Sequence, residues 1–271
     1  MLKLLERNIA TIERRLVLLA PPQATLPESF TNITVDSTRH AQLLRDMQRM
    51  RGRIYMEDGA LERHQLSPEG LHQTPEDDKS WHLLMLNNDG EVSACEWYLE
   101  HSTNVSLEQL RAWHCPLVKV REWSHTLRLA VESEIQRARR DCLRYAEVGG
   151  WAVSKDCRCS SAGLLLALGG YSLARALGGS LMMVTATVRH SSSTILRRLG
   201  GSAFEFGGRT VPAYFDPKYN CEMELLRFDS RRPNERYIHL IELLRSRLSN
   251  VSVLTSSVGQ FGHAAHATAA A

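Results

Sequence analysis

Apolar residues in the first part of the chain recur at helical spacing. They are Leu2, Leu5, Ile9, Ile12, Leu16 and Leu19, with charged residues between them. Steps of three and four residues place such side chains on one stripe of a helix. The pattern therefore predicts an amphipathic helix that ends at Pro21-Pro22. We expect the stripe to pack on its own domain, although a partner or a membrane surface is an alternative use for it.

The next pattern predicts a strand, a helix and a hairpin. A short strand over residues 32–35 precedes a helix over residues 40–55, and the polar stretch 57–79 reads as a loop. Two apolar runs, 81–86 and 92–99, then flank Asn87-Asn88-Asp89-Gly90. This turn chemistry between two apolar runs indicates a β-hairpin.

In the second half, helical and strand patterns alternate. Helices are predicted over residues 126–145, 163–177, 192–199 and 235–248, and strands over residues 148–153, 181–187, 222–228 and 251–254. Such alternation after a hairpin predicts an α/β (α+β) fold, in which a mixed central sheet has helices on both faces. We divide the chain into an N-terminal amphipathic helix with a linker (1–29), one main domain (30–255) and a tail (256–271) whose small polar residues predict disorder.

Composition narrows the class of partner. The 271 residues are 43% hydrophobic and 23% charged, which is ordinary for a globular protein. A net charge of +3 without a concentrated Lys/Arg stripe argues against nucleic acid. The mild basicity suits an acidic or phosphorylated partner, such as a coenzyme or an acidic carrier protein. A solvated surface with a few extra arginines explains it equally well.

The cysteines and the apolar runs point to a reducing compartment. Six cysteines are scattered along the chain, and only Cys157 and Cys159 stand close together. This is neither a disulfide framework nor a zinc-site spacing, so we expect free thiols and no metal. No apolar run reaches the 18 to 20 residues of a membrane span, and the charged first turn is unlike a signal peptide. We therefore expect a cytoplasmic protein.

One segment carries the pattern of an anion site. An apolar strand ending near Val153 and Ser154 runs into a loop with Arg158, Ser160 and Ser161, and this loop opens a helix. A helix N-terminus offers unpaired backbone N–H groups and a partial positive charge, and an arginine adds a charge-assisted contact to phosphate. The alternative is that the two serines only cap the helix.

This segment resembles the coenzyme-binding core of GNAT-fold N-acyltransferases, which usually reads Arg/Gln-x-x-Gly-x-Gly/Ala. The chain has Arg158-x-x-Ser161-x-Gly163. A closer resemblance is to the acyl-homoserine lactone (autoinducer) synthases and the long-chain N-acyl amino acid synthases. It is carried by residues 47–55, 147–153 and 184–188 and extends from Ile33 to Phe228. The resemblance implies a GNAT-like fold with an N-terminal helical extension.

The resemblance also implies an activity: transfer of an acyl chain, medium or long, from acyl-CoA or from the acyl-phosphopantetheine of an acyl carrier protein to a small-molecule amine. Where the lactone synthases carry an arginine, this chain has Gly150, and their Trp-Arg pair appears as Glu96-Trp97. Their two spaced aspartates appear as the adjacent Asp77 and Asp78. These departures favour an amino acid or a similar amine over S-adenosylmethionine as the acceptor.

Individual residues receive expected roles from the same resemblance. Glu147 lies at the position of the general base, and Glu96 is a second candidate because its neighbours are apolar. Their alternatives are a solvated glutamate and a cross-strand ion pair. The expected donor-binding residues are Val153, Ser154, Arg158, Ser160, Ser161 and Gly163, and the expected substrate-binding residues are Arg51, Trp97, Trp151, Thr185 and Thr187. We further expect backbone N–H groups near residues 152–154 to polarise the thioester carbonyl.

Two other functions remain open at this point. One is an acetyl-CoA-dependent GNAT acetyltransferase, and the other is a catalytically silent regulator that binds a thioester or a carrier protein. A serine hydrolase is disfavoured because no Gly-x-Ser-x-Gly motif is present. The sequence leaves acyl length, acceptor identity and oligomeric state undefined.

Overall fold

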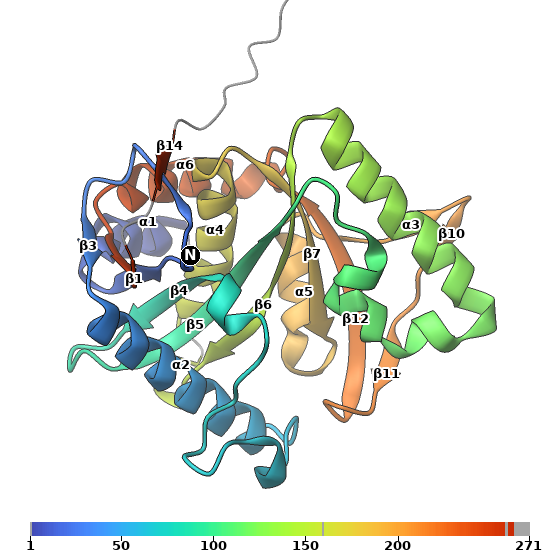
Figure 1. Cartoon of the computed structure of the whole chain (residues 1–271), viewed down its shortest axis with the longest axis horizontal. Coiled ribbons are helices and arrows are strands. Elements are labelled where there is room, and N and C mark those ends of the chain that lie inside the picture. Colours follow the sequence, from blue (N-terminus) through green and yellow to red (C-terminus); the bar gives the residue numbers. More distant parts are fainter. Residues whose placement is uncertain (1, 159, 258–259, 263–271) are drawn as a thin grey trace, which may run out of the picture. The chain divides into compact units, whose positions relative to one another are not determined.

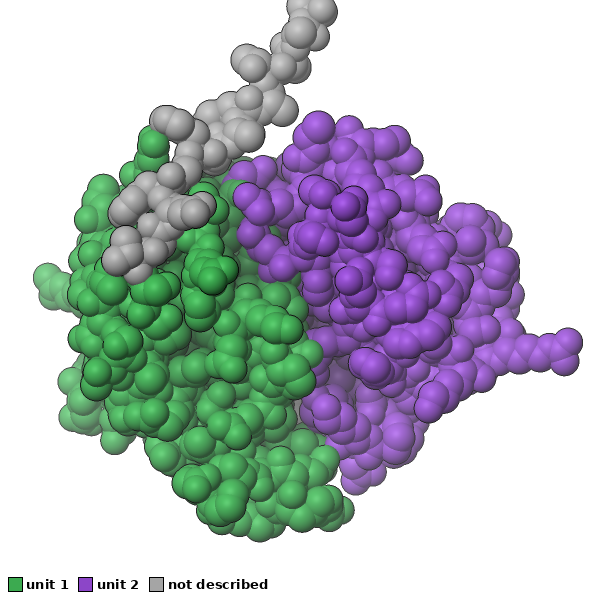
Figure 2. Space-filling model, in the orientation of Figure 1, with its two compact units in different colours: residues 1–99, 149–177, 236–265 green, residues 100–148, 178–235, 266–271 purple. Residues whose placement is uncertain are grey.

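The computed structural model describes residues 2–158, 160–257 and 260–262 (Figure 1). It divides the chain into two compact units, which Figure 2 colours separately. Unit 1 contains residues 1–99, 149–177 and 236–265, and unit 2 contains residues 100–148 and 178–235 together with 266–271, which lie outside the described residues. The boundaries of these units differ from the predicted boundaries at residues 29 and 255. That division stays a prediction.

The N-terminal segment is not one helix. Helix α1 covers Leu2–Ala10, a short 3-10 turn covers Ile12–Arg14, and Leu16–Leu19 form strand β1. The prediction of a helix up to residue 19 is therefore wrong beyond α1. Strand β1 has β4 on one side and β13 on the other, and a strand enclosed in this way carries a continuous apolar run rather than alternation. The stripe of α1 is buried within its own unit, where α1 packs against α6.

Unit 1 is a sheet between two layers of helices. Its strands, besides β1, are β3 (Ile33–Val35), β4 (Trp81–Leu86), β5 (Val92–His101, as far as residue 99), the second half of β6 (Arg144–Val153) and β13 (Ser252–Thr255). Its other helices are α2 (Ser37–Glu57), α4 (Ala162–Ala176) and α6 (Ile238–Leu248). Apolar side chains of α2 cover Leu84 and Cys95 on one face. On the other face, Gly169 of α4 lies against Leu83.

Two short strands stand beside this sheet. Gln260–Gly262 form β14, which pairs in parallel with β2 (Thr25–Pro27). Strand β14 falls in the segment whose composition predicts disorder, and backbone pairing needs no apolar side chains. The rest of that tail, residues 258–259 and 263–271, lies outside the described residues.

Unit 2 has its own core on a smaller part of the sheet. Its strands are the first half of β6, β7 (Ser180–Thr187), β8 (Ser202–Ala203), β11 (Tyr214–Asp216) and β12 (Cys221–Asp229), with the hairpin of β9 (Glu205–Phe206) and β10 (Arg209–Thr210). Strand β7 pairs in parallel with β6 and antiparallel with β12. Helix α3 (Arg121–Arg140) covers one face, and α5 (Ser192–Arg198) packs on β7 and β12.

One boundary in unit 2 was predicted wrongly. The helical pattern over residues 126–145 predicts a helix to residue 145, but α3 ends at Arg140 and β6 begins at Arg144. Cys142 has a φ of 53°, in the left-handed region, which stops the helix. The residues that follow pair with β7, so strand pairing overrides their helical spacing.

The described strands form the order β11-β12-β7-β6-β5-β4-β1-β13-β3, with β8 beside β12. The sheet is mixed and helices lie on both of its faces, as the sequence predicts. Strand β6 contributes residues to both units. It is also the strand that carries Glu147, Gly150 and Trp151.

Candidate functional site

Two adjacent glycines make β6 irregular. Gly150 has a φ of 63°, a conformation typical of glycine at a β-bulge. The indole of Trp97, from β5, lies directly on this backbone. A Cβ atom on Gly149 would lie 2.5 Å from its Cζ2, and one on Gly150 would lie 2.3 Å from its Cδ1. The two glycines therefore make room for a buried tryptophan where the lactone-synthase motif has an arginine.

We expect Gly150→Ala to destabilise the protein more than a glycine substitution that changes backbone strain alone. The matched control is Gly90→Ala, because Gly90 has a φ of 80° and a Cβ there meets nothing within 4 Å. Both changes carry the left-handed strain of about 1–2 kcal/mol. Only Gly150→Ala must also displace Trp97, which adds about 1–3 kcal/mol. Urea unfolding of both variants measures the difference, and equal losses would show that Trp97 moves without cost.

A buried ion pair ties the long loop to helix α2. Arg51 of α2 donates from Nη2 to both carboxylate oxygens of Asp77, at 3.0 and 2.7 Å. Their side chains are only 1% and 2% exposed. Arg51 also donates to His72, from Nε to Nδ1 at 3.1 Å and from Nη2 to the main-chain oxygen at 2.6 Å. The pair is thus buried and does not lie on the surface, and Arg51 fixes the loop over residues 72–77.

The carboxylate of Asp77 is saturated with donors. Besides Arg51, it accepts from Gln48 Nε2 at 3.0 Å and from the N–H and hydroxyl of Thr74 at 3.0 and 3.1 Å. Burial alone would raise the pKa of Asp77, but the charge and hydrogen bonds of Arg51 hold it below its usual range. His82 donates from Nε2 to the Asp77 carbonyl at 2.7 Å, and burial lowers the pKa of His82 to about 4. Arg51 is therefore the cation that compensates the charge of Asp77.

Arg51 retains one unused donor. Its Nη1 is buried without a hydrogen-bond partner, and a Cβ atom on Gly150 would lie 3.1 Å from it. The guanidinium thus faces the same irregular backbone that Trp97 covers. Arg51 and Trp97, both expected to bind substrate, are brought together at Gly150. Trp151 is not part of this group, because its indole lies against Gly163 at the start of α4, 3.1 Å from a Cβ placed there.

The loop before α4 is already hydrogen-bonded to other parts of unit 1. Arg158 donates from Nη2 to Oδ1 of Asp58 at 2.9 Å, and Ser161 Oγ accepts from Asn8 of α1 at 2.6 Å. The N–H of Ser154 donates to the carbonyl of Ser93 at 2.8 Å. This last bond contradicts the expectation that the Ser154 N–H polarises a thioester carbonyl, because β5 already uses it.

Three other residues that are expected to bind the acyl donor lie around the start of α4. Ser160 Oγ accepts from the N–H of Ala162 at 3.1 Å and donates to the carbonyl of Cys157 at 2.6 Å, which is the capping role that we considered as an alternative. Val153 lies 3.4 Å from a Cβ placed on Gly163. A side chain on Gly163 would therefore crowd both Val153 and Trp151. Cys159 lies outside the described residues.

Glu147 is held in place by two donors in unit 2. Its Oε1 accepts from the main-chain N–H of Arg111 at 3.0 Å, and its Oε2 accepts from the same N–H at 3.2 Å and from His101 Nε2 at 3.0 Å. The Glu147 side chain is 5% exposed and that of His101 is 12% exposed. The alternative of a solvated glutamate is therefore wrong. Sequence reasoning missed His101 and Arg111, which are 46 and 36 residues away along the chain.

Glu96 occupies a different environment from Glu147. It lies on the face of β5 opposite to Trp97, where a Cβ on Gly170 of α4 would come within 2.4 Å of its Oε1. That oxygen is buried without a hydrogen-bond partner. Leu83 stands opposite it on β4, so the alternative of a cross-strand ion pair is also excluded. Burial raises the pKa of Glu96 well above its usual range, and the Gly170 main chain offsets this only in part.

We expect this buried carboxyl to make the protein less stable as the pH rises. Below pH 4, about the ordinary pKa of a glutamate, both folded and unfolded states keep the proton. Above it, only the folded state keeps the proton, so Glu96 lowers the unfolding free energy by up to about 1.4 kcal/mol per pH unit until its folded pKa is reached. Glu96→Gln removes this slope. Urea unfolding between pH 5 and 8 measures it, with Glu205→Gln, at an exposed position, as the control. Parallel curves for wild type and Glu96→Gln would contradict the assignment.

Thr185 and Thr187, which are expected to bind substrate, lie on β7 in unit 2. Both are partly buried, and they share one face of the strand with Met183, which stands opposite Glu147 in the parallel register. Thr187 donates its hydroxyl to the carbonyl of Arg189 at 3.1 Å. Thr185 thus lies on the face of the sheet that carries Glu147. Their role toward an acyl chain stays a prediction.

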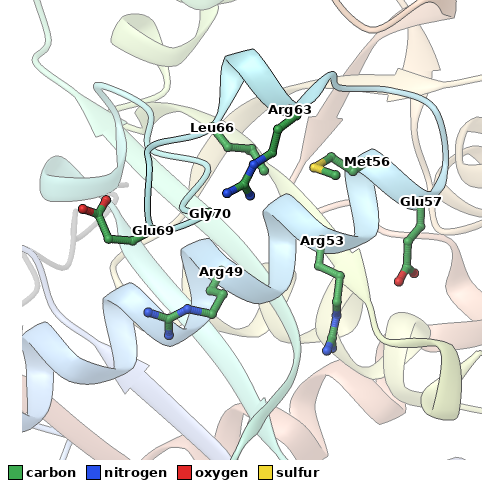
Figure 3. Close-up of a pocket in the computed structure, with 8 residues that line it drawn as sticks. All are labelled: Arg49, Arg53, Met56, Glu57, Arg63, Leu66, Glu69 and Gly70. Carbon is green, nitrogen blue, oxygen red and sulfur yellow. The ribbon is translucent and has the colours of Figure 1, made fainter.

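A pocket of about 450 Å³ lies between α2 and the loop in unit 1. It is lined by Arg49, Arg53, Met56, Glu57, Arg63, Leu66, Glu69 and Gly70. Figure 3 shows Arg63 reaching in from the loop, whereas Arg49 and Arg53 of α2 point away from it in different directions. The three guanidinium groups therefore do not converge on one point, and the pocket does not form an anion site.

Two kinds of feature are absent from the part of the chain that the structure describes. No helix among residues 2–158, 160–257 and 260–262 is long and apolar enough to cross a membrane. Over the same residues, His, Cys, Asp and Glu side chains form no group of three or more that could hold a metal ion.

Known structures share this fold. No protein-family model matches the sequence, and no curated protein matches it significantly. BjaI, a CoA-dependent acyl-homoserine lactone synthase solved with SAM and isopentyl-CoA, matches with a TM-score of 0.51 and 15% identity, over 92% of this chain and 93% of BjaI. Its structure with MTA gives the same values. FeeM, an N-acyl amino acid synthase from uncultured soil microbes, matches with a TM-score of 0.42 and 12% identity, over 73% of this chain and 91% of FeeM. The resemblance to the autoinducer synthases is thus confirmed for the fold, which is GNAT-like.

Proposed function

We propose that the protein is an N-acyltransferase that moves an acyl chain from a thioester to the amine of an amino acid or a similar small molecule. The observation that carries the proposal is Glu147. It is a buried carboxylate held by His101 and by the Arg111 N–H, and it lies three residues before the irregular Gly150 on the same strand. The fold shared with BjaI, which was solved with isopentyl-CoA, supports a thioester as the donor.

The reaction sets three requirements. The attacking amine must be neutral, the thioester carbonyl must be oriented, and the proton of the amine needs an acceptor. A C–N bond forms and the C–S bond breaks, so the pantetheine thiol leaves and takes up a proton. Glu147 supplies a negative charge that stabilises the proton after it has left the amine. Glu96 lies on the opposite side of β5 from Trp97, and burial raises its pKa well above the usual range, so we assign it no part in this proton transfer.

The donor is an acyl-CoA or the acyl-phosphopantetheine of an acyl carrier protein. Helix α4 begins four residues after Arg158, and a helix N-terminus and an arginine both attract phosphate. Arg158 is paired with Asp58 in the structure, at a partly exposed position. Binding of the donor would exchange that carboxylate for a phosphate oxygen, and Ser160 and Ser161 would flank it.

The acceptor is expected near Arg51 and Trp97. Arg51 holds the loop and directs one unpaired N–H toward Gly150. An anionic group on the acceptor, such as the carboxylate of an amino acid, would match this cation. This chain has Gly150 where the lactone synthases carry an arginine, and this difference favours such an acceptor over SAM.

Product mass spectrometry tests the proposal directly. The purified protein is incubated with acetyl-CoA, palmitoyl-CoA or acyl carrier thioesters, each with pooled amino acids and amines. A long-chain N-acyl product is the expected result and identifies the acceptor. An acetylated product would favour the acetyltransferase instead. Donor binding without any product would favour the silent binding protein.

A further inference from the structure

The contact between Glu147 and His101 determines which nitrogen of the imidazole donates a hydrogen bond. An ionised carboxylate can only accept hydrogen bonds, so His101 Nε2, 3.0 Å from Glu147 Oε2, must carry the proton. In a neutral imidazole, Nδ1 then holds the lone pair. Among the described residues, Nδ1 has no hydrogen-bond partner. His101 therefore presents a proton acceptor that is already oriented.

The two side chains differ in access. Both oxygens of Glu147 face donors, so an amine would have to displace either the Arg111 N–H or His101 to reach them. His101 is the more exposed partner, at 12% against 5%. A group that takes a proton from a substrate has to lie within hydrogen-bond reach of it. This geometry favours the imidazole over the carboxylate as the contact for the substrate.

The charged and titratable groups near the pair leave Glu147 as the carboxylate that contacts His101. Tyr145 lies two residues before Glu147 on the same face of β6, and burial together with the charge of Glu147 raises its pKa well above the usual range. It therefore stays neutral. The side chain of Arg111 donates to the hydroxyl of Tyr219 at 3.2 Å, and Arg144 pairs with Glu100 at a more exposed position. Glu147 is thus the one carboxylate that contacts His101 in the described residues.

We infer that His101 accepts the proton of the attacking amine and that Glu147 acts as its positioning residue. The inference rests on the proposed N-acyltransferase function. As the amine nitrogen bonds to the thioester carbon, its proton moves to Nδ1 of His101. The resulting imidazolium remains hydrogen-bonded to Glu147 through Nε2. The imidazolium then returns the proton to the departing thiolate, which regenerates the neutral imidazole.

The test is chemical rescue of His101→Ala. Turnover is expected to fall about 10²- to 10⁴-fold, which is the usual contribution of a general base. Added imidazole should restore it at least tenfold, because a free imidazole can occupy the vacated space beside Glu147. Imidazole should not restore Glu147→Gln, in which the carboxylate is missing. His114→Ala, at an exposed histidine in the same unit, is the matched control and should keep full activity with or without imidazole.

A second variant distinguishes loss of the proton acceptor from loss of the fold. In His101→Gln the amide N–H can still donate to Glu147, so the pair remains satisfied while the proton acceptor is lost. It should melt like the wild type and remain as inactive as His101→Ala. Turnover of either variant within threefold of wild type, or no response of His101→Ala to imidazole, would overturn the inference. Those results require an active wild type, so they leave the proposed function standing; a wild type inactive with every donor would remove both.

Discussion

Replacing Asp77 by asparagine should lower the unfolding free energy by about 3–5 kcal/mol, because it leaves the charge of Arg51 uncompensated in the interior. Arg51 is 1% exposed, and Asp77 is its one carboxylate partner among the described residues. The amide can keep only part of the hydrogen bonding, since its NH₂ group would face the donors of Arg51 and Thr74. Urea unfolding of the variant and the wild type measures the loss.

Two further variants show whether charge is the cause. Asp46→Asn breaks the pair with Arg49 on the exposed side of α2, where the Arg49 side chain is 53% exposed and that of Asp46 is 32% exposed. This change should lower the unfolding free energy by less than about 1 kcal/mol. The double variant Arg51→Met with Asp77→Leu removes both charges and should be more stable than Asp77→Asn. If the double variant proved as unstable as the single one, the loss would come from packing and not from an unpaired charge.

Glu147→Gln should reduce turnover about 10²- to 10⁴-fold while leaving donor affinity within a few-fold of wild type. The amide oxygen can still accept from Arg111 or His101, so the local structure is kept. The negative charge is lost, and with it the stabilisation of a proton that arrives from the amine. Steady-state turnover and isothermal titration with a non-reactive donor analogue separate the two quantities. Glu222→Gln, on an exposed position of β12 in the same unit, is the control. Full turnover of Glu147→Gln would remove the carboxylate from the proton route.

Local patterns predicted the elements that depend on neighbours in sequence. Helix α2 follows from its apolar spacing and from Asp36, which caps it by accepting from the Arg39 N–H at 2.8 Å. The hairpin of β4 and β5 follows from the turn over residues 87–90. Strand β1 could not be predicted in this way, because Leu16–Leu19 continue the spacing of a helix and become a strand only between β4 and β13.

The site was predicted one residue at a time, but its contacts were not. The motif pointed to Arg51 and Glu147, yet Arg51 meets Asp77 across 26 residues and Glu147 meets His101 across 46. No local pattern couples such distant positions. His101 ends a strand whose apolar run stops at Leu99, so it reads as an ordinary polar residue at a strand end. The replacement of arginine by Gly150 was visible, but the tryptophan that packs on it was not.

The order of the strands determines when the protein can fold. Strand β1 pairs with β13, so Val17 meets Ser252 across nearly the whole chain, and β3 also depends on β13. Contacts between distant residues slow folding, because closing a long loop costs entropy before the contact repays it. In a nascent chain, β4 can pair with one edge of Leu16–Leu19, but the other edge stays unpaired until β13 has been synthesised. The sheet of unit 1 is thus completed only when β13 is available, and an unpaired strand edge of this kind is prone to aggregation until then.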